Sequence, residues 1–340
     1  MSDVAAMSER ALPSVSVLLP AWNEASTLGR CLDSLLAIPW PDLEIILCAG
    51  GNDGTVEIAK RYAAAHPDRI VFLEQRPGEG KQAALRRCYE CSRGEVIYLT
   101  DADCVIPAET LERMVRAVAS GESDAATGPA EPLPEQRHRA WIRHQWATIR
   151  AVDRQRPPEA TGILGRNCAV RRAAVEATGG FTEPVAIGTD YHFAKRLLSA
   201  GMTIRFVSAP VQTHFAESIG DYLGQQSRWL RNILVHGPRF GDRAEVAAII
   251  KTVSLGTGLL FWPLTWRWTR LPGIGLWALT LGWMTKARLR QQRSLEAEMG
   301  LRRSGEVSLL VSSALFSLVD LVAWARPAFD LLSPKRRLRW

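Results

Sequence analysis

The sequence lacks several features that would indicate particular classes of protein. Its six cysteines form no regular framework, and the lone C-x-x-C of Cys88 and Cys91 has no second pair for a zinc site, so we expect a reducing compartment. Residues 1–13 are polar and contain no apolar segment of the kind that secretory signal peptides need. Gly78-Glu-Gly-Lys81 has neither the spacing nor the Ser or Thr of a P-loop.

Positive charge is not spread over the whole chain, which excludes a uniformly basic nucleic-acid-binding protein. The 340 residues carry a net charge of +7. Residues 241–340 contain 15 Lys and Arg against 7 Asp and Glu, whereas the first 240 residues contain 27 against 28. Seven of the 12 Trp residues lie at or after Trp262. Because Trp, Lys and Arg beside apolar segments are typical of a membrane interface, we expect a near-neutral soluble part followed by a membrane-associated part.

The first hundred residues alternate between apolar strands and helices. Strands are expected at 15–20, 43–48, 70–73 and 96–100, and helices at 26–38, 56–65 and 81–92. This alternation predicts an α/β fold with a mainly parallel sheet, in which ligands bind beyond the carboxyl ends of the strands. Later helices are expected at 138–154, 191–200 and 219–235, and later strands before 170 and at 204–208. The amphipathic helix at 138–154 either packs on the sheet or lies at an acceptor cleft or membrane surface.

Three apolar runs follow, at 252–266, 271–285 and 307–325. A full membrane span needs about 20 residues, so only the third run, which is interrupted by Asp320, is long enough by itself. Trp, Lys and Arg collect at the ends of the runs, and we therefore favour two or three membrane helices over a soluble helical core. The expected organisation is a polar tail at 1–13, an α/β domain at 14–240 and a membrane-associated region at 241–340.

Asp101 and Asp103 follow the fourth expected strand and lie two residues apart. Both carboxylates reach one ligand if the strand ends there. Such a pair suits a hard divalent cation that also holds phosphate oxygens. Taken alone, the pair is explained equally well by the chemistry of a turn.

Five further segments surround this acidic pair in a fixed order. They are Pro20–Glu24, Gly50–Thr55, Gly80–Leu85, Gly188–Asp190 and Gln225–Trp229. The ordered set resembles the family 2 glycosyltransferases with the GT-A fold, in particular membrane-attached members with a Q-x-x-R-W motif in the ceramide glucosyltransferase-like group. Arg166–Arg171, followed by Gly179–Phe181, is similar to the acceptor side of that family. The resemblance covers residues 15–232.

The resemblance implies an enzyme of glycolipid biosynthesis. It would transfer a hexose, with inversion, from a nucleotide-diphosphate sugar to a lipid at the cytoplasmic face of the cell inner membrane. A UDP-sugar is favoured and a GDP-sugar comes second, because Cys48 and Ala49 stand where the family usually has an acidic pair. Mg²⁺ or Mn²⁺ is expected as the cofactor. The expected partners are the donor, the lipid acceptor and the membrane, and no nucleic acid.

Site residues are assigned by matching positions in the motifs. Asp190 is expected to be the general base, and an N-cap role for the following helix is the alternative. The expected metal ligands are Asp101, Asp103 and His214, although a structural histidine is nearly as good an interpretation of the last. The expected donor contacts are Pro20, Ala21, Glu24, Asp53, Lys81, Asp101 and Arg228. The expected acceptor or gate residues are Gln225, Trp229 and Asn167.

Two other functions stay open. A processive polysaccharide synthase of the same family also carries Q-x-x-R-W, but at most three apolar helices give little material for a channel. An inactive nucleotide-sugar-binding membrane module would keep the fold without turnover. The intact Asp101, Asp103, Asp190 and Q-x-x-R-W residues argue against that second alternative.

Overall fold

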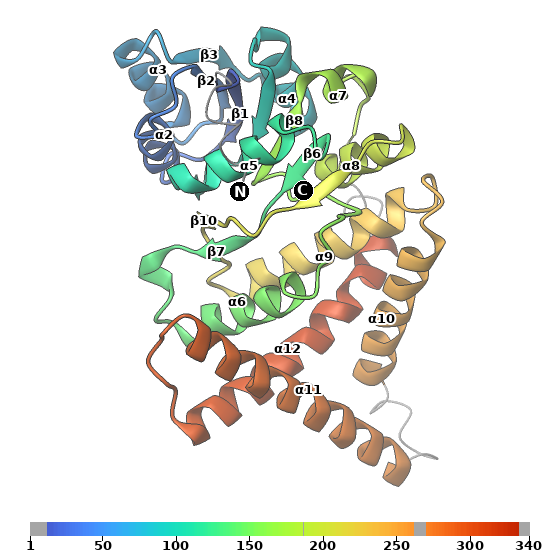
Figure 1. Cartoon of the computed structure of the whole chain (residues 1–340). Coiled ribbons are helices and arrows are strands. Elements are labelled where there is room, and N and C mark those ends of the chain that lie inside the picture. Colours follow the sequence, from blue (N-terminus) through green and yellow to red (C-terminus); the bar gives the residue numbers. More distant parts are fainter. Residues whose placement is uncertain (1–11, 186, 262–269, 333–340) are drawn as a thin grey trace, which may run out of the picture. The chain divides into compact units, whose positions relative to one another are not determined.

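The computed structural model describes residues 12–185, 187–261 and 270–332, and the chain forms two compact units (Figure 1). Unit 1 comprises residues 1–131 and 157–213, and unit 2 comprises residues 132–156 and 214–340. The chain thus leaves unit 1, returns to it and leaves it again. As a result, helix α6 (Ala140–Asp153) belongs to the same unit as the last helices of the chain.

A seven-stranded sheet with the order β3-β2-β1-β4-β8-β6-β9 forms the centre of unit 1. Its first four strands are parallel to one another, whereas β8 runs antiparallel to both β4 and β6. The strands are β1 (Val15–Trp22), β2 (Leu43–Gly50), β3 (Ile70–Glu74), β4 (Val96–Leu99), β6 (Ala125–Thr127), β8 (Cys168–Arg171) and β9 (Ile204–Phe206). A smaller sheet has the order β5 (Cys104–Val105), β10 (Val211–Thr213), β7 (Ala130–Pro132).

Helices cover both faces of the large sheet because buried side chains alternate between the two faces of its central strand. Val17 and Leu19 of β1 pack into one core, and Leu18 packs into the other, with all three fully buried. The first core includes α2 (Leu28–Leu36), α3 (Thr55–Ala65) and α5 (Ala108–Ala119). The second includes α4 (Gly80–Cys91), α7 (Arg172–Ala177) and α8 (Thr189–Ser199). This arrangement confirms the predicted α/β class.

Unit 2 is built from helices. Helix α6 packs against α11 (Arg270–Glu298) and α12 (Glu306–Leu332), and α9 (Ile219–His236) packs against α10 (Arg243–Phe261) and α12. A short 3-10 helix, Pro134–Gln136, precedes α6. The amphipathic helix expected at 138–154 corresponds to α6, and it packs among the C-terminal helices of this unit.

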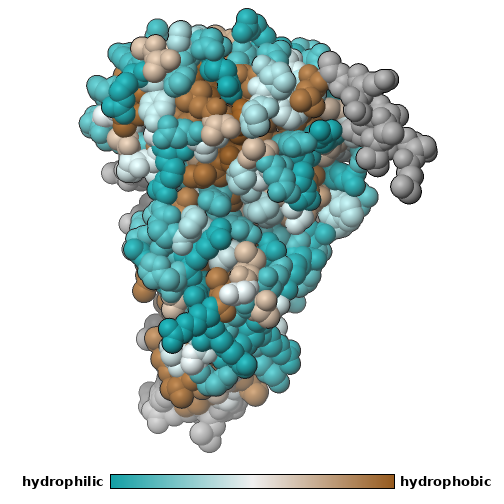
Figure 2. Space-filling model, turned by 60° about the vertical axis from the view of Figure 1, so that its left-hand side comes forward, coloured by the Kyte–Doolittle hydropathy of each residue, from teal (hydrophilic) through white to brown (hydrophobic). Residues whose placement is uncertain are grey.

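Helices α10 and α12 are long and apolar enough to cross a membrane, judged by length and composition. Only 17% of the apolar window of α10 and 39% of that of α12 is buried inside the protein, which is little for the core helices of a soluble protein. Along α12, the exposed Val307, Val311, Leu315 and Leu318 follow one helical face. Figure 2 shows hydrophobic surface in brown at the end of unit 2 that lies lowest in the view, with hydrophilic surface in teal above it.

The structure differs from the expectations at three places. Strand β1 continues to Trp22, because its parallel pairing with β2 runs on to Gly50. Helix α11 includes the second apolar run but continues as a polar helix to Glu298. Among the helices that the structure describes, α10 and α12 are long and apolar enough to cross a membrane, and α11 is not. The expected boundary at residue 240 does not coincide with the division between the units, because α6 and α9 pack with the later helices. Most of the expected polar tail lies outside the described residues.

Candidate functional site

The loops that follow β1 and β2 are joined by the carboxylate of Asp53. Its Oδ1 accepts hydrogen bonds from the amide and the hydroxyl of Thr55 at 3.1 and 2.6 Å, and its Oδ2 accepts one from the amide of Ala25 at 3.0 Å. The Thr55 hydroxyl oxygen also accepts a hydrogen bond from the amide of Glu24 at 2.7 Å. The hydrogen bonds from Thr55 and Ala25 lower the pKa of Asp53. Asp53 therefore positions the loop that carries Glu24, and its contact with a nucleotide stays a prediction.

Two glycines allow the same two loops to approach each other closely. A Cβ on Gly50 would lie 2.6 Å from the ring of Trp22, and a Cβ on Gly51 would lie 2.2 Å from Oδ1 of Asn23. Gly51 also has a φ of +119°, which favours glycine. At the end of β1, Ala21 is part of the buried core. A contact between Ala21 and the donor would therefore be made through the backbone.

Asp101 and Asp103 lie directly after β4, at the carboxyl edge of the parallel strands, as the sequence predicts. Lys81, in the first turn of α4, forms an ion pair with Oδ1 of Asp101. Asp103 accepts a hydrogen bond at Oδ2 from the hydroxyl of Thr213, in β10, at 3.0 Å. Lys81 thus neutralises one member of the acidic pair, and its predicted contact with the nucleotide stays a prediction.

Negative charge accumulates at this edge of the sheet. Burial raises the pKa of Asp103, the charge of Asp101 raises it further, and Arg166 acts in the opposite direction. Burial also raises the pKa of Glu24, and the charges of Asp103 and Asp101 add to that effect. Burial acts to lower the pKa of Lys81, but the charge of Asp101 outweighs it and raises the pKa. The site is therefore suited to a cationic ligand.

The residues present fit a divalent cation that takes only some of its ligands from the protein. Among the residues that the structure describes, no group of three or more His, Cys, Asp or Glu side chains is placed to hold a metal ion. The raised pKa of Asp103 reflects repulsion by Asp101 as well as burial, and a cation would relieve both. Mg²⁺ is usually bound through one or two carboxylates together with substrate phosphates and water. Asp101 and Asp103 can meet that requirement.

His214, the third expected metal ligand, is the residue at which the chain enters unit 2 for the second time. Its side chain is 46% exposed, and its Nε2 lies 3.4 Å from Oε1 of Glu217. Glu217 also accepts a hydrogen bond from Gln136 at 2.9 Å. The structure thus gives His214 an acidic neighbour within its own unit, and its role as a metal ligand stays a prediction.

Asp190 lies in the first turn of α8, one residue beyond the first helical position. The N-cap is Gly188, with a φ of +70°, and no side chain caps the helix. Oδ1 of Asp190 accepts a hydrogen bond from the adjacent amide of Tyr191 at 3.0 Å. The alternative that Asp190 is the N-cap is therefore wrong. Besides burial and Asp101, the charge of Asp190 acts on the pKa of Lys81, so Asp190 lies near the acidic pair.

Asn167 is fully buried and makes hydrogen bonds inside unit 1. Its Oδ1 accepts one from the hydroxyl of Tyr98 at 2.8 Å, and its Nδ2 donates to the carbonyls of Pro129 and Ala209 at 3.1 and 2.8 Å. A Cβ on Gly128 would lie 2.5 Å from that Nδ2, so the chain passes tightly around it. The side chain of Asn167 therefore has a structural role, in place of the predicted contact with the acceptor.

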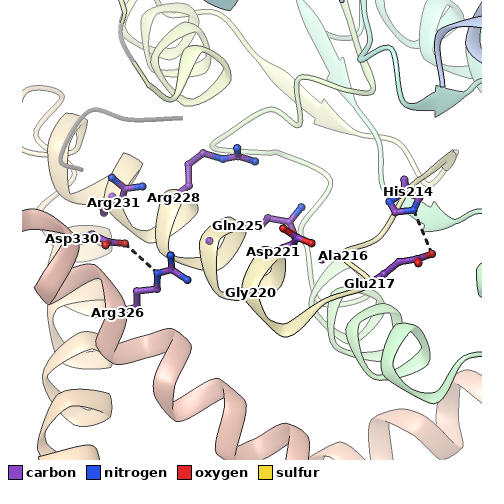
Figure 3. A pocket seen from close by; sticks show the side chains of 11 residues that line it. His214, Ala216, Glu217, Gly220, Asp221, Gln225, Arg228, Arg231, Arg326 and Asp330 are labelled. Carbon is purple, nitrogen blue, oxygen red and sulfur yellow. Dashed lines mark ion pairs between the residues drawn. The ribbon is translucent and has the colours of Figure 1, made fainter. Parts of the chain in front are cut away.

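In unit 2, helix α9 carries the Q-x-x-R-W motif and lines a cavity of about 980 Å³ (Figure 3). Gln225 and Arg228 both line this cavity, and their contacts with acceptor and donor stay predictions. His214 lines it as well. Trp229 is half-buried, and it is not one of the residues that line this cavity.

Arg231, Arg326 and Asp330 are among the residues of this cavity that were missed by reasoning from the sequence. Arg231 follows Arg228 by three positions on α9, and that helical spacing could have identified it. Arg326 and Asp330 come from α12, and only the packing of α12 against α9 brings them to the cavity. No motif marks these two residues in the sequence.

Comparison with known proteins relates most of this chain to glycosyltransferases. The family model described as glycosyl transferase family 2 matches residues 16–179. Glycosyltransferase AglE of Haloferax volcanii is 28% identical over 226 residues, which are 64% of this chain and 72% of that protein. An N-acetylglucosaminyltransferase of Azorhizobium caulinodans is 25% identical over 292 residues, which are 76% of this chain and 72% of that protein.

A solved structure shows the same fold. The mannosyltransferase PcManGT from Pyrobaculum calidifontis, in complex with GDP-Man and Mn²⁺, superposes with a TM-score of 0.56 at 20% identity. The match covers 94% of this chain and 86% of that one. At this identity the likeness concerns the fold, and it confirms the predicted GT-A fold. GDP-Man and Mn²⁺ are ligands of that mannosyltransferase.

Proposed function

Residues 16–179 are a family 2 glycosyltransferase domain, and from this premise we propose that the enzyme transfers a sugar, with inversion, from a nucleotide-diphosphate sugar to a membrane lipid. One observation carries the proposal. Within unit 1, the acidic pair after β4 and the carboxylate of Asp190 both act on Lys81, which supports placing the proposed proton acceptor close to the proposed cation site. A glycosyltransferase needs both at one site.

The donor is proposed to bind along the carboxyl edge of the parallel strands. The loops after β1 and β2 are held there by Asp53, and in parallel sheets this edge is where ligands bind. Asp101 and Asp103 would hold a divalent cation, which, when bound, would offset the negative charge of the donor diphosphate. Arg228 is proposed as a further contact to the donor. UDP- and GDP-sugars are the two donors to compare, since the mannosyltransferase with the same fold was solved with GDP-Man.

Asp190 is proposed to be the general base. Because Gly188 occupies the N-cap, the helix does not require the side chain of Asp190 as its cap. Asp190 is half-buried, and a Cβ on Gly165 would lie 3.7 Å from its Oδ2. It would accept the proton of the acceptor hydroxyl as that oxygen attacks the anomeric carbon. One base and one displacement give inversion at that carbon.

The acceptor is proposed to be a lipid, presented at the cytoplasmic face of the cell inner membrane. Support comes from α10 and α12, whose apolar windows are mostly not buried in the protein. Unit 2 also exposes Leu279, Trp283 and Val307, which are 73%, 68% and 76% accessible. Large apolar surface of this kind marks contact with a membrane or a partner protein. Arg243 is the first residue of α10, and Arg302 and Arg303 lie shortly before α12, as basic residues do at a membrane interface.

A donor screen with product analysis tests this function. The full chain, purified in detergent, is incubated with labelled UDP- and GDP-sugars, with Mg²⁺ or Mn²⁺, and with a lipid extract, and the lipid products are analysed by mass. The proposal expects one sugar added to a lipid, and it expects the Asp190→Asn variant to add none. Long polymer products would instead indicate a processive synthase. No transfer and no donor hydrolysis would indicate an inactive binding module.

A further inference from the structure

Helix α12 has two different sides, although its sequence is mostly apolar. A stripe of exposed apolar side chains follows one face of the helix at spacings of three or four residues. It consists of Val307, Val311, Leu315, Leu318 and Val322. We refer to these five residues as the apolar stripe. The stripe begins in the first turn of the helix and continues past its middle, so one face of α12 is free to contact an apolar partner.

The side of α12 that is turned toward the protein makes polar contacts along the helix. In its first half, the hydroxyl of Ser312 lies 3.0 Å from Nε2 of His144. In the middle, Asp320 forms an ion pair with Arg288 of α11. Near the end, Asp330 accepts a hydrogen bond at 2.6 Å from a serine hydroxyl of α9. The polar side and the apolar stripe therefore run along the same helix on different faces.

A crossing α12 would carry these polar contacts into the hydrocarbon of the membrane. From Ser312 to Asp330 the helix rises by about 27 Å, close to the hydrocarbon thickness of about 30 Å. The ion pair of Asp320 would lie near mid-depth, where ionisable side chains are costly. Helix α9, which packs against α12 and lines the charged cavity, would enter the bilayer as well. A helix that lies in the plane of the membrane, with its stripe toward the lipid, avoids these costs.

Helix α10 leads to the same orientation through a different observation. Lys251 is exposed and lies near the middle of its 19 residues. The uncharged run that follows, at 252–266, has 15 residues, whereas a full span needs about 20. Ile250 and Leu255, which flank Lys251, are 52% and 46% exposed. A lysine among exposed apolar side chains suits a helix at the membrane interface, because its ammonium group can reach the headgroups.

Basic residues stand on both sides of each of these two helices. Helix α10 begins at Arg243, and Arg267 follows it in the sequence. Arg302 and Arg303 precede α12, and residues 335–339 include four Lys and Arg. Basic residues beside apolar segments are kept on one side of the membrane. If both flanks of a helix stay on the same side, that helix does not cross.

The same charges indicate which kind of membrane fits. Residues 241–340 carry 15 Lys and Arg against 7 Asp and Glu. Arg302 and Arg303 are exposed, and Val307 at the start of the apolar stripe is exposed as well. Cations next to exposed apolar side chains complement anionic headgroups above lipid tails. Each basic residue close to an anionic surface strengthens binding by about fivefold.

We propose that unit 2 binds one leaflet of an anionic membrane, with α10 and α12 lying in that leaflet and not crossing the bilayer. Both flanks of each helix then stay on the side from which the protein binds. The inference rests on the proposed function for the lipid acceptor, which would be taken from that same leaflet.

Cysteine labelling in sealed membrane vesicles tests whether the helices cross. Cys91 is exposed and the other five cysteines are buried, so Cys91 marks the side of unit 1. Two further reporters, Arg302→Cys and a cysteine added after Trp340, are introduced one at a time into the Cys91→Ser chain. A membrane-impermeant maleimide should label all three from the same side. Labelling of either new reporter from the opposite side, or only after detergent is added, would overturn the proposal.

Flotation with vesicles of defined composition tests the partner. The full chain should bind phosphatidylglycerol vesicles at least about tenfold more tightly than phosphatidylcholine vesicles, and salt should weaken that binding. The double variant Arg302→Gln, Arg303→Gln should bind the anionic vesicles about tenfold more weakly. Its control is Arg61→Gln, Arg113→Gln, which removes two exposed charges from unit 1 and should bind like the parent. Equal binding of the parent to both kinds of vesicle would contradict the assignment to an anionic membrane.

The double variant Val311→Ser, Leu315→Ser tests the apolar stripe. Both side chains are more than half exposed, so its melting temperature in detergent should match that of the parent. Its binding to vesicles should fall by at least about tenfold, because the stripe no longer offers a continuous apolar face. A variant that binds vesicles like the parent, but is a monomer where the parent is a dimer, would show that a second copy of the chain covers the stripe. The proposal would then be wrong.

Sugar transfer, measured on the same vesicles, separates this inference from the proposed function. A protein whose three reporters are labelled from one side, but which transfers no sugar, would contradict the proposed function alone. A protein that transfers sugar to lipid while Arg302→Cys and Cys91 are labelled from opposite sides would contradict this inference alone.

Discussion

Replacing Arg288 with leucine should lower the free energy of unfolding by about 3–5 kcal/mol, the usual cost of removing one partner of a buried ion pair. Arg288 of α11 is paired with Asp320 of α12, and their side chains are 6% and 10% exposed. Tyr222 of α9 donates its hydroxyl to Oδ1 of Asp320 at 2.7 Å. The variant would leave the carboxylate of Asp320 buried without its cation, in the middle of an apolar helix.

Two further contacts of Arg288 place the expected loss toward the upper end of that range. The guanidinium donates a hydrogen bond to the hydroxyl of Thr148 at 2.9 Å and lies 4.2 Å from the centre of the Phe316 ring. A desolvated cation–π contact alone contributes about 2 kcal/mol. The triple variant Arg288→Leu, Asp320→Leu, Tyr222→Phe should recover most of the loss, because replacing a whole buried ionic group by apolar residues is often neutral or stabilising.

Unfolding of the full chain in detergent, followed by circular dichroism, measures these differences. Arg303→Leu is the control, because Arg303 belongs to an ion pair with Glu306 whose side chains are 75% and 76% exposed. Its effect should stay within about 0.5 kcal/mol. A loss of less than about 1 kcal/mol for Arg288→Leu, the value of a surface pair, would refute the reasoning. So would a triple variant that is less stable than the single one.

Three other predictions follow from the structure. Asp103→Ala should keep the fold but lose at least about a hundredfold in turnover, because it removes a carboxylate from the cation site, and full activity in EDTA would show that no such site operates. A chain ending at Phe240 should aggregate, because it loses α10 and α12, which cover α9, and a monodisperse peak in gel filtration would contradict this. Burial lowers the pKa of His144 to about 4. Between pH 6.5 and 4 the histidine is therefore protonated in the unfolded chain but not in the folded one, and the free energy of unfolding decreases by up to about 3 kcal/mol as the pH is lowered through this range. His144→Gln should remove that part of the pH dependence of the melting temperature, and parallel curves for variant and parent would argue against it.

The sequence predicted the parallel half of unit 1 well because its signals are local. Strands β1 and β2 are continuous apolar runs, and each ends in a turn rich in Gly or Asx residues. Helix α5 could also have been found, since Leu111, Met114, Val115 and Val118 follow helical spacing. Strands β6, β7 and β10 have three residues each and depend on pairing with distant strands, so no local pattern reveals them.

Within the candidate site, the motifs identified residues but not their surroundings. Asp53 and Asn167 have hydrogen-bond partners far along the chain, and these partners give both side chains structural roles. The choice between Asp190 and Gly188 as the N-cap depends on a backbone angle, which the sequence does not specify. Arg326 could not be found because it directly follows the apolar run at 307–325, which indicates only a hydrophobic helix. Its place in the cavity depends on the packing of α9 against α12.

Glycosyl transfer by the Asp190→Asn variant tests the central claim most directly. Asparagine keeps the shape of the side chain and loses the ability to accept a proton at neutral pH. Because Asp190 is not the N-cap, the variant should melt near the parent temperature and bind the donor normally. The account predicts that transfer to lipid falls by about a hundredfold to ten-thousandfold. A folded variant that transfers sugar at more than about a tenth of the parent rate would contradict it.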